Sequence, residues 1–561
     1  MEFGMNFGPS GLAPYEAVCY YSGLPSRPRL VARTGVEWTE DPQQEMWSYH
    51  KYLSSVEDHP IVELWKEDQP LPHLIMKALA SLPWVAIDVL RVGVFHFDNT
   101  IPVVMLVTVE PGETRWAIAD LIATNCKNIL TQFGITDVEV EIKESSYCCS
   151  TLSDSDTSDN VSNVSDPPPR LYSGSPDVFH QYPLDKLVQD LRHLSDCIGT
   201  RIRNDATPST TGTKGIYLNV APANPHIWTF EPCTAALTCR RVVFRGKDDS
   251  GKVYHWDGQV STRQFISQDT GVSDIAHKIE KKLIEEGKRV NRLALFSLKY
   301  DSGQHEDQRT DLEDEVYEIS RQADAARAAR SILDMTHEDT SIQIGHVLFA
   351  QELSTAFPRT SMSSSASSSQ LSPATYTRGS WLRDYALVQV SGEVHTRPAK
   401  NRLPINYDKL RKKLDGSVPE YPRRKFTGDA TEGNAVLSSE VVPDGKAGKR
   451  RVVGKFGVHG LTFGFVNGVK SVIRKRQIHN VVDEHVAWEI CVVSTDRVNS
   501  SAFSRGSDSG SAIWDLKSRV LGMITAGLGD PATSIMDTTY ATSMERILQD
   551  LEASGIKATL G

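Results

Sequence analysis

A polar tract from Ser150 to Asp177, with the sequence STLSDSDTSDNVSNVSDPPPRLYSGSPD, limits how this chain can fold more than any other feature. The tract is rich in Ser, Asp and Pro, and it has too few apolar side chains to offset the entropy that ordering would cost. We therefore predict a disordered linker between two domains. The length of the chain, 561 residues, independently favours two domains over a single core.

A helical pattern and a second polar tract interrupt the C-terminal part of the chain. Val272, Ile275 and Ile279 recur at helical spacing, and a Ser-rich run follows further on. We therefore divide the chain into a tail at 1–29, an α+β domain at 30–146, a disordered linker at 147–183, and a C-terminal domain at 184–561 with a helical insertion at 271–338 and a disordered loop at 354–380.

Hydrophobic periodicity predicts the fold class of each domain. In the first domain, HLIMKALASL and AIADLIATNCKNILTQFG have helical spacing, and the second pattern ends at Gly134. The runs VAIDVLRVGVF, PVVMLVTVEP and TDVEVEIKES are typical of strands, which makes this domain α+β. The C-terminal domain is predicted to be all-β from the runs KGIYLNV, ALTCRRVVF, YALVQV, LTFGFVNGV, AWEICVVS and RVLGMITAG, with the closing helix SMERILQDLEASG.

The strongest chemical signal is the run GSDSGSAIW, in which Ser509 lies between small residues. A nucleophilic serine needs a tight turn that exposes its hydroxyl and directs backbone N–H groups at a developing oxyanion. Taken alone, the run is also compatible with a plain hairpin turn. Three further runs accompany it: WLRDYALV with Asp384, KFGVHGLTFG with His459, and ALTCRRVVF with Arg241.

Together these runs resemble the motifs of trypsin-like serine peptidases, in particular the divergent intracellular members found in fungi. The resemblance covers roughly Leu184 to Leu560 and implies a chymotrypsin-like domain with two antiparallel β-barrels. The α+β domain before it is similar to the N-terminal region that accompanies such domains in fungal proteins of unassigned role. The resulting expectation is a multidomain protein: an α+β domain, then an all-β double barrel with a helical insertion.

The resemblance also implies roles for individual residues. Ser509 takes the position of the nucleophile and Asp384 that of the triad aspartate. The backbone N–H groups of Ser507 and Ser509 would form the oxyanion hole. The strand that pairs with a substrate would contain Thr525, Ala526 and Gly527.

Two departures from the family pattern argue against catalysis. Arg241 occupies the position of the catalytic histidine, and a guanidinium does not lose its proton at physiological pH. Loss of the base alone removes on the order of 10⁶-fold of the rate, because the triad acts as a unit. Ser507 stands where the family has glycine, and its Cβ restricts the oxyanion loop. We also expect Arg241 to form a charge-assisted hydrogen bond with Asp384.

Another histidine could in principle replace the missing base. His346, in the run SIQIGHVLFAQ, fits best, but it falls on a strand-like run between the helical insertion and the Ser-rich loop. A structural or solvent-facing histidine is therefore the default interpretation. The nearest candidates by segment are His226, His255, His346 and His459.

Composition and charge argue against several other classes of protein. The net charge of −10 disfavours nonspecific binding to nucleic acid or to an anionic membrane. The chain shows no signal-peptide pattern and no apolar run that could span a bilayer, so we predict an intracellular protein, cytoplasmic or nuclear. The eight cysteines have no paired spacing, and we expect no metal and no small-molecule cofactor.

Three functions remain open at this point. The leading hypothesis is a pseudoprotease, in which the peptidase fold is a binding or regulatory scaffold for a peptide or protein partner. The second is an active serine endopeptidase with a non-standard base, which could cut its own linker near Ser150 to Asp177. The third is a signalling adaptor that acts through the N-terminal domain.

Overall fold

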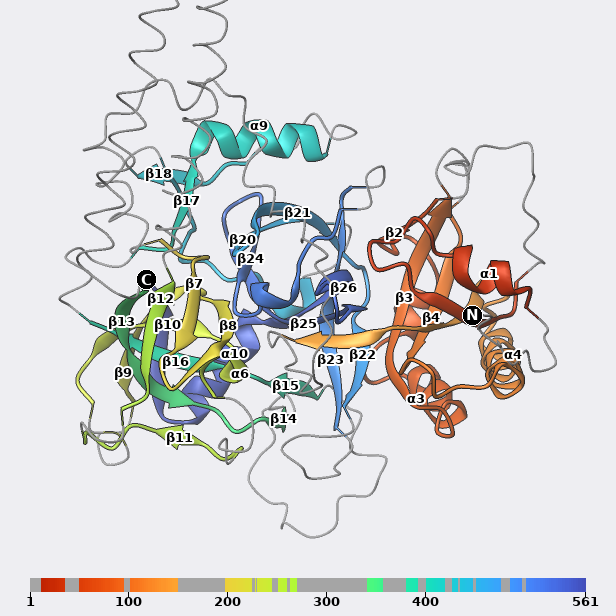
Figure 1. The fold of residues 1–561 in the computed structure, drawn as a ribbon, viewed down its shortest axis with the longest axis horizontal. Coiled ribbons are helices and arrows are strands. Elements are labelled where there is room, and N and C mark those ends of the chain that lie inside the picture. Colours follow the sequence, from red (N-terminus) through yellow and green to blue (C-terminus); the bar gives the residue numbers. More distant parts are fainter. Residues whose placement is uncertain are drawn as a thin grey trace, which may run out of the picture.

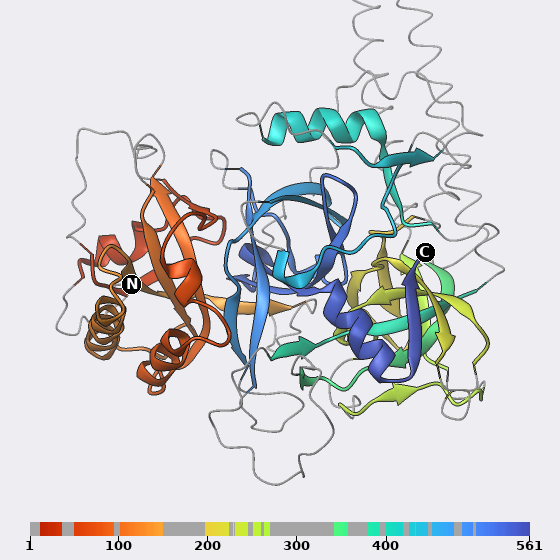
Figure 2. The same cartoon turned by 180° about the vertical axis from the view of Figure 1, so that it is seen from behind.

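The structure is a computed structural model, and most of it is β-structure with few helices (Figure 1). Figures 1 and 2 show three parts side by side: an N-terminal unit, a central barrel and a second sheet. The structure describes residues 12–35, 50–94, 101–149, 197–223, 228, 230–244, 251–259, 263–269, 341–356, 380–391, 400–418, 426–431, 434–446, 451–475, 485–496 and 501–561.

The N-terminal unit packs helices against one end of a large sheet. The long helix α4 turns Ile122, Cys126 and Leu130 toward the core, at the three- and four-residue spacing of an amphipathic helix. Gly134, with φ of +78°, follows the end of this helix as predicted. The elements of the unit are α1 (Pro14–Cys19), β1 (Arg29–Arg33), β2 (Lys51–Ser54), α2 (Ile61–Leu64), α3 (Pro70–Ala78), β3 (Trp84–Val94), β4 (Val103–Val109), α4 (Trp116–Gln132) and β5 (Glu139–Glu144).

The central part is a closed barrel of six antiparallel strands. Each strand pairs with the next, and the last pairs with the first, so the barrel has no free edge along its closed circuit. In order around the barrel, the strands are β20 (Val452–Gly457), β21 (Gly460–Val466), β23 (His485–Ser494), β26 (Ile535–Ser543), β25 (Val520–Asp530) and β24 (Ala512–Asp515).

One continuous sheet joins the N-terminal unit to the barrel. β22 (Ser471–Lys475) pairs with β3 on one side and with β23 on the other. The core of the N-terminal unit accordingly includes Val472 of β22 and Trp488 of β23. The α+β domain is therefore joined to the barrel by strand pairing as well as by the linker. The sequence could not indicate this pairing, because hydrophobic periodicity does not reveal which strands pair.

The second sheet contains nine strands, which pair without closing into a circuit among the described residues. The expectation of two barrels is therefore confirmed only in part, because the described residues form one closed barrel and one further β-sheet. β11 (Tyr254–His255) pairs with β13, off the main path. Along that path the strands are β27 (Ile556–Leu560), β9 (Tyr217–Pro222), β10 (Cys233–Thr238), β16 (Ala386–Val390), β13 (Ser341–Ala350), β12 (Phe265–Asp269), β7 (Arg201–Asn204) and β8 (Thr207–Thr213).

Smaller elements complete the described structure. The helix α10, predicted from SMERILQDLEASG, buries Met544, Ile547 and Leu551 and is followed by Gly555 at φ +83°. With their bounds, the smaller elements are α6 (Arg240–Val243), β14 (Ser354–Ala356), β15 (Trp381–Arg383), β17 (Arg402–Asn406), α9 (Tyr407–Ser417), β18 (Asp429–Thr431), β19 (Asn434–Val436), η6 (Asp444–Lys446), η7 (Gly506–Asp508) and α10 (Met544–Ala553).

Three segment boundaries differ from the sequence predictions. The expected tail at 1–29 contains α1 and buries Tyr21 and Leu24, because these side chains complete the core beneath β1. Residues 147–149, assigned to the linker, belong to strand β6 (Ser146–Cys149), whose backbone pairs with β25. Residues 354–356 form β14, which pairs with β15. The helical insertion at 271–338, the rest of the linker and residues 357–379 lie outside the described residues.

The apolar pattern of the run ALTCRRVVF predicted a single strand, and this prediction is wrong. β10 ends at Thr238, and Arg240–Val243 form the short helix α6. The Arg240 guanidinium donates hydrogen bonds to two carbonyl oxygens, that of Gln351 at 2.7 Å and that of Ala350 at 3.3 Å. This buried tertiary contact overrides the local β-type pattern.

A buried carboxylate of the N-terminal unit is held by the barrel, and this contact makes a stability prediction. The Tyr540 hydroxyl on β26 lies 2.9 and 3.0 Å from the two carboxylate oxygens of Asp88 on β3, and the Ser471 hydroxyl donates to one of them. We expect Tyr540→Phe to lower the free energy of unfolding by about 1–3 kcal/mol, because Asp88 loses a donor it cannot replace with water. Chemical denaturation measures this loss; Tyr15→Phe, at a half-exposed tyrosine, should change stability by no more than about 0.5 kcal/mol.

Candidate functional site

The turn that carries Ser509 lies between η7 and β24 and depends on its small residues. Gly510 has φ of +94°, a conformation that residues with a side chain rarely adopt, and a Cβ there would lie 2.3 Å from the Thr213 carbonyl oxygen. The Ser509 side chain is fully buried. Its hydroxyl donates to the carbonyl oxygen of Thr525 on β25 at 3.2 Å.

The helix that carries Arg241 lies beside this turn. α6 and η7 both contact β8. A Cβ at Gly212, on β8, would lie 2.3 Å from the Val242 side chain and 3.1 Å from the Ser509 carbonyl oxygen. Only glycine therefore fits where α6 and the Ser509 turn meet, and the fold brings Arg241 and Ser509 into one region.

The Arg241 guanidinium binds Asp384, which confirms the sequence prediction of this pair. Nε of Arg241 donates to Oδ2 of Asp384 at 2.8 Å, and Nη2 lies 2.6 Å from the same oxygen. The backbone N–H of Arg241 donates to Oδ1 at 3.2 Å. The Asp384 side chain is fully buried and that of Arg241 is 10% exposed. Arginine therefore engages both oxygens of the buried carboxylate.

The backbone N–H of Ser509 already has a partner inside its own turn. It donates to the Gly506 carbonyl oxygen at 3.4 Å. The Ser507 carbonyl oxygen accepts a hydrogen bond from the Thr213 hydroxyl at 2.9 Å, which fixes the preceding peptide. An oxyanion hole needs N–H groups that point at an unoccupied position. In this conformation the Ser509 N–H points at the Gly506 carbonyl oxygen and does not point at an unoccupied oxyanion position.

A buried ion pair anchors the same turn from the barrel side. Nζ of Lys455 on β20 lies 2.5 Å from Oδ2 of Asp508, and both side chains are fully buried. The backbone N–H of Arg505 donates to the same oxygen at 2.9 Å. Burial on its own raises the pKa of Asp508. The Lys455 ammonium, His459 and the Arg505 backbone N–H together lower it by more, so the pKa lies below its usual value. The run KFGVHGLTFG begins with Lys455, but it does not indicate that Asp508 is the partner of this lysine.

None of the described histidines considered as an alternative base has a hydrogen bond to the Ser509 hydroxyl, whose partner is the Thr525 carbonyl oxygen. Nε2 of His459 lies 2.9 Å from the hydroxyl of Ser507 rather than that of Ser509, and burial lowers the pKa of His459 below its usual value. His346 lies on β13 against a tryptophan ring, and burial lowers its pKa to about 4. His255 also packs on a tryptophan, and His226 lies outside the described residues.

The strand expected to pair with a substrate is already paired. Thr525, Ala526 and Gly527 lie in β25, and β24 pairs only with the first part of that strand. β6 pairs antiparallel with the second part, so that Cys149 lies opposite Ala526 and Cys148 opposite Gly527. Figure 1 shows β6 as the orange arrow that runs from the N-terminal unit into the centre of the molecule. A segment of the chain itself thus occupies the position expected for a peptide.

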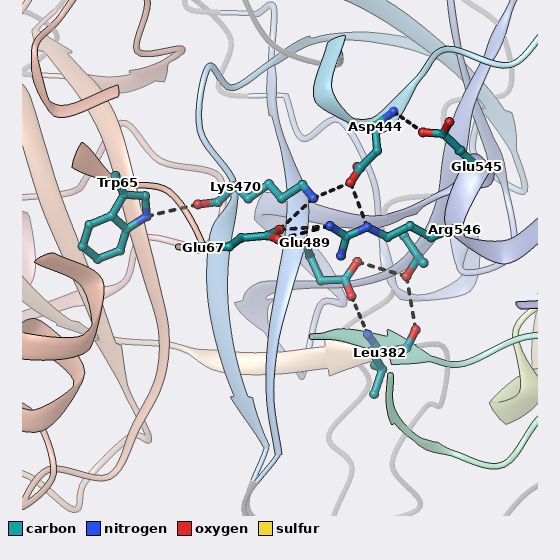
Figure 3. Close-up of polar contacts among 9 residues, drawn as sticks. Trp65, Glu67, Leu382, Asp444, Lys470, Glu489, Glu545 and Arg546 are labelled. Atoms are coloured by element: carbon teal, nitrogen blue, oxygen red, sulfur yellow. Dashed lines mark hydrogen bonds and ion pairs between the residues drawn. The ribbon is translucent and has the colours of Figure 1, made fainter. Parts of the chain in front are cut away.

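A cavity of about 960 Å³ lies away from these residues, between the N-terminal unit and the barrel. Arg241, Asp384 and Ser509 do not line it. Figure 3 shows four charged side chains in its wall, in which Lys470 and Arg546 each contact both Glu67 and Asp444 at 2.7–3.0 Å. Two cations and two anions neutralise one another in this network, so it favours neither an anionic nor a cationic ligand.

Glu489 lies next to this network and predicts a pH dependence of stability (Figure 3). Burial raises its pKa from 4.5 to about 7, although Leu382 N–H and the Thr542 hydroxyl donate to its oxygens at 2.9 and 3.0 Å. The folded state therefore holds a proton that the unfolded chain releases, and stability falls as the pH rises from 4.5 to 7. We expect Glu489→Gln to be stabilising above this window by about 1–3 kcal/mol.

Denaturation midpoints across the pH range measure this effect. Glu489→Gln should differ from the unmodified protein mainly at the alkaline end, where the carboxylate is charged. Glu63→Gln, at a glutamate whose side chain is 76% exposed, is the matched control and should show no such pH dependence. An equal change in stability at pH 4.5 and above pH 7 would show that the charge on Glu489 is not the cause.

The sequence was compared with protein-family models and with curated proteins. No protein-family model matches it. No curated protein matches it significantly. Within the described ranges, no three His, Cys, Asp or Glu side chains are arranged to hold a metal ion. The described helices include none with the length and apolar character needed to cross a membrane.

Proposed function

We propose that residues 184–561 form a chymotrypsin-like peptidase domain without peptidase activity, which acts as a binding or regulatory scaffold for a peptide or protein partner. The ion pair between Arg241 and Asp384 carries this proposal, because the sequence resemblance assigns these two residues to the positions of a triad histidine and aspartate. A guanidinium keeps its proton at physiological pH and cannot accept one from Ser509. The closed six-stranded barrel and the small-residue turn at Ser509 support the assignment of the fold.

A self-cleaving serine peptidase is the second candidate, and the position of β6 favours it. Cys149, at the end of β6, lies opposite Ala526. The neighbouring Thr525 provides the carbonyl oxygen that accepts the Ser509 hydrogen bond. The chain that follows Cys149 would then be the substrate. This candidate needs a base that the described residues do not supply.

Intact-mass measurement of the purified full chain separates the two candidates. After prolonged incubation at neutral pH, we expect one mass, that of the uncut chain, for the unmodified protein and for Ser509→Ala. We also expect neither protein to digest an unfolded protein substrate. A cut just after Cys149 that occurs in the unmodified protein and is absent from Ser509→Ala would replace the proposal by the self-cleaving candidate.

A further inference from the structure

The second part of β25 would be an exposed strand edge if β6 were absent. β24 pairs with β25 from Val520 to Met523 only, whereas β26 covers the opposite side of β25 along most of its length. The unpaired N–H and C=O groups of such an edge bind another extended segment readily. β6 satisfies them from Ala526 to Gly529. A short extended segment of the chain itself therefore covers this edge.

The chain is guided onto this edge by Ser145, at the junction between β5 and β6. The backbone N–H of Ser145 donates to the Val109 carbonyl oxygen in the N-terminal sheet at 3.2 Å. Its hydroxyl donates to the Gly529 carbonyl oxygen on β25 at 3.1 Å. Ser145 thus joins the N-terminal unit to the start of the occupied edge, and β6 is held there as a tethered strand.

An aromatic side chain of β6 lies over the residue that replaces the catalytic histidine. Tyr147 is opposite Leu528 of β25, and its ring centroid is 6.0 Å from the Arg241 guanidinium carbon. A cation at this distance from an aromatic ring is attracted to it. Arg241 is oriented in turn by Asp384. The substituted triad therefore contributes directly to holding an aromatic residue on the β25 edge.

We propose that β6 is an intramolecular mimic of a peptide ligand, and that it competes for the β25 edge with an extended segment of a partner protein that carries an aromatic side chain opposite Leu528. This inference rests on the proposed function, because it takes the β25 edge as the binding site of the scaffold. The partner's main chain would replace the pairing of β6, and its aromatic ring would replace Tyr147 beside Arg241. A tethered strand competes at an effective concentration on the order of mM, so the closed form excludes weak ligands.

A labelled synthetic peptide tests the competition by fluorescence anisotropy. The peptide spans residues 143–150, with serine at both cysteine positions, and is titrated into the full chain. Tyr147→Pro combined with Cys148→Pro in the protein removes strand N–H groups and should release β6. We expect this variant to bind the peptide at least about tenfold more tightly than the unmodified protein. Glu113→Pro, in an exposed loop, is the matched control and should not change the affinity.

The side-chain part of the proposal is tested with the same proteins. A second peptide, with alanine in place of the tyrosine, should bind the released variant several-fold more weakly, because it lacks the ring beside Arg241. Equal binding of the two peptides would overturn the aromatic requirement. Hydrogen exchange at β3 and β4 reports whether the proline variant is folded.

The outcomes for the inference and for the proposed function are distinguishable. A folded proline variant that binds the peptide no better than the unmodified protein would overturn the competition. If that variant does not fold, excess peptide should still accelerate hydrogen exchange of Ser146–Cys149 in the unmodified protein, and no acceleration would overturn the inference. Peptide that is bound and then cut would leave the binding site standing but contradict the absence of peptidase activity.

Discussion

Asp384→Ala is expected to lower the free energy of unfolding by about 3–5 kcal/mol, because it leaves the Arg241 guanidinium buried without its counter-ion. The substitution also removes the acceptor of the Arg241 backbone N–H. Breaking one side of a buried ion pair costs far more than the pair contributes when both partners are present. Chemical denaturation of the full chain measures the loss.

Two controls show whether the unpaired charge causes the loss. Asp137→Ala breaks an ion pair with His59 in which the aspartate side chain is 71% exposed, and it should cost less than about 1 kcal/mol. Asp384→Leu combined with Arg241→Leu removes both charges and should recover much of the stability. A loss below about 1 kcal/mol for Asp384→Ala would contradict the structural importance given to this pair.

Arg241→His is expected to increase the rate at which a fluorophosphonate probe labels Ser509 by about 10²-fold, the lower end of what a general base contributes. An imidazole on α6 would replace the guanidinium beside Asp384 and could accept the Ser509 proton. Recovery should stay partial for two reasons. The Ser509 N–H is bound within its turn, and β6 covers the adjoining strand.

A second substitution and two controls sharpen this prediction. Arg241→His combined with Ser507→Gly should exceed either change alone, because it also removes the Cβ that restricts the oxyanion loop. Arg240→His, at a residue whose guanidinium binds the Gln351 carbonyl oxygen, should give no gain. Ser509→Ala in the double variant must abolish labelling. Folded variants that gain no reactivity would contradict the proposal that the lack of a base keeps Ser509 unreactive.

Elements with a long local pattern could be predicted from the sequence. The apolar spacing of α4 and the continuous apolar runs of β3 and β4 specify these elements within consecutive residues. The Arg241–Asp384 pair could also be predicted, since the resemblance placed both residues in one site and a buried carboxylate needs a donor. α6 shows the limit of local patterns, because Arg240 is drawn to carbonyl oxygens that lie on β13 and just after it.

Contacts between distant segments that no recognised motif marks could not be predicted. β6 is four residues long and precedes a polar tract, so its sequence carries no strand signal, and its partner β25 lies in the C-terminal part of the chain. The same limit applies to the pairing of β22 with β3, which merges the two predicted domains into one sheet. Lys455 and Asp508 form a buried ion pair, but nothing in their local sequence marks them as partners.

Labelling of the unmodified full chain with a fluorophosphonate probe tests the central claim most directly. The proposed lack of a base predicts that Ser509 reacts no faster than the background given by Ser509→Ala. The same result is expected in the variant with Tyr147→Pro and Cys148→Pro, in which β6 no longer limits access to the site. Rapid labelling at Ser509 in either protein, located by mass spectrometry and absent from Ser509→Ala, would contradict the account.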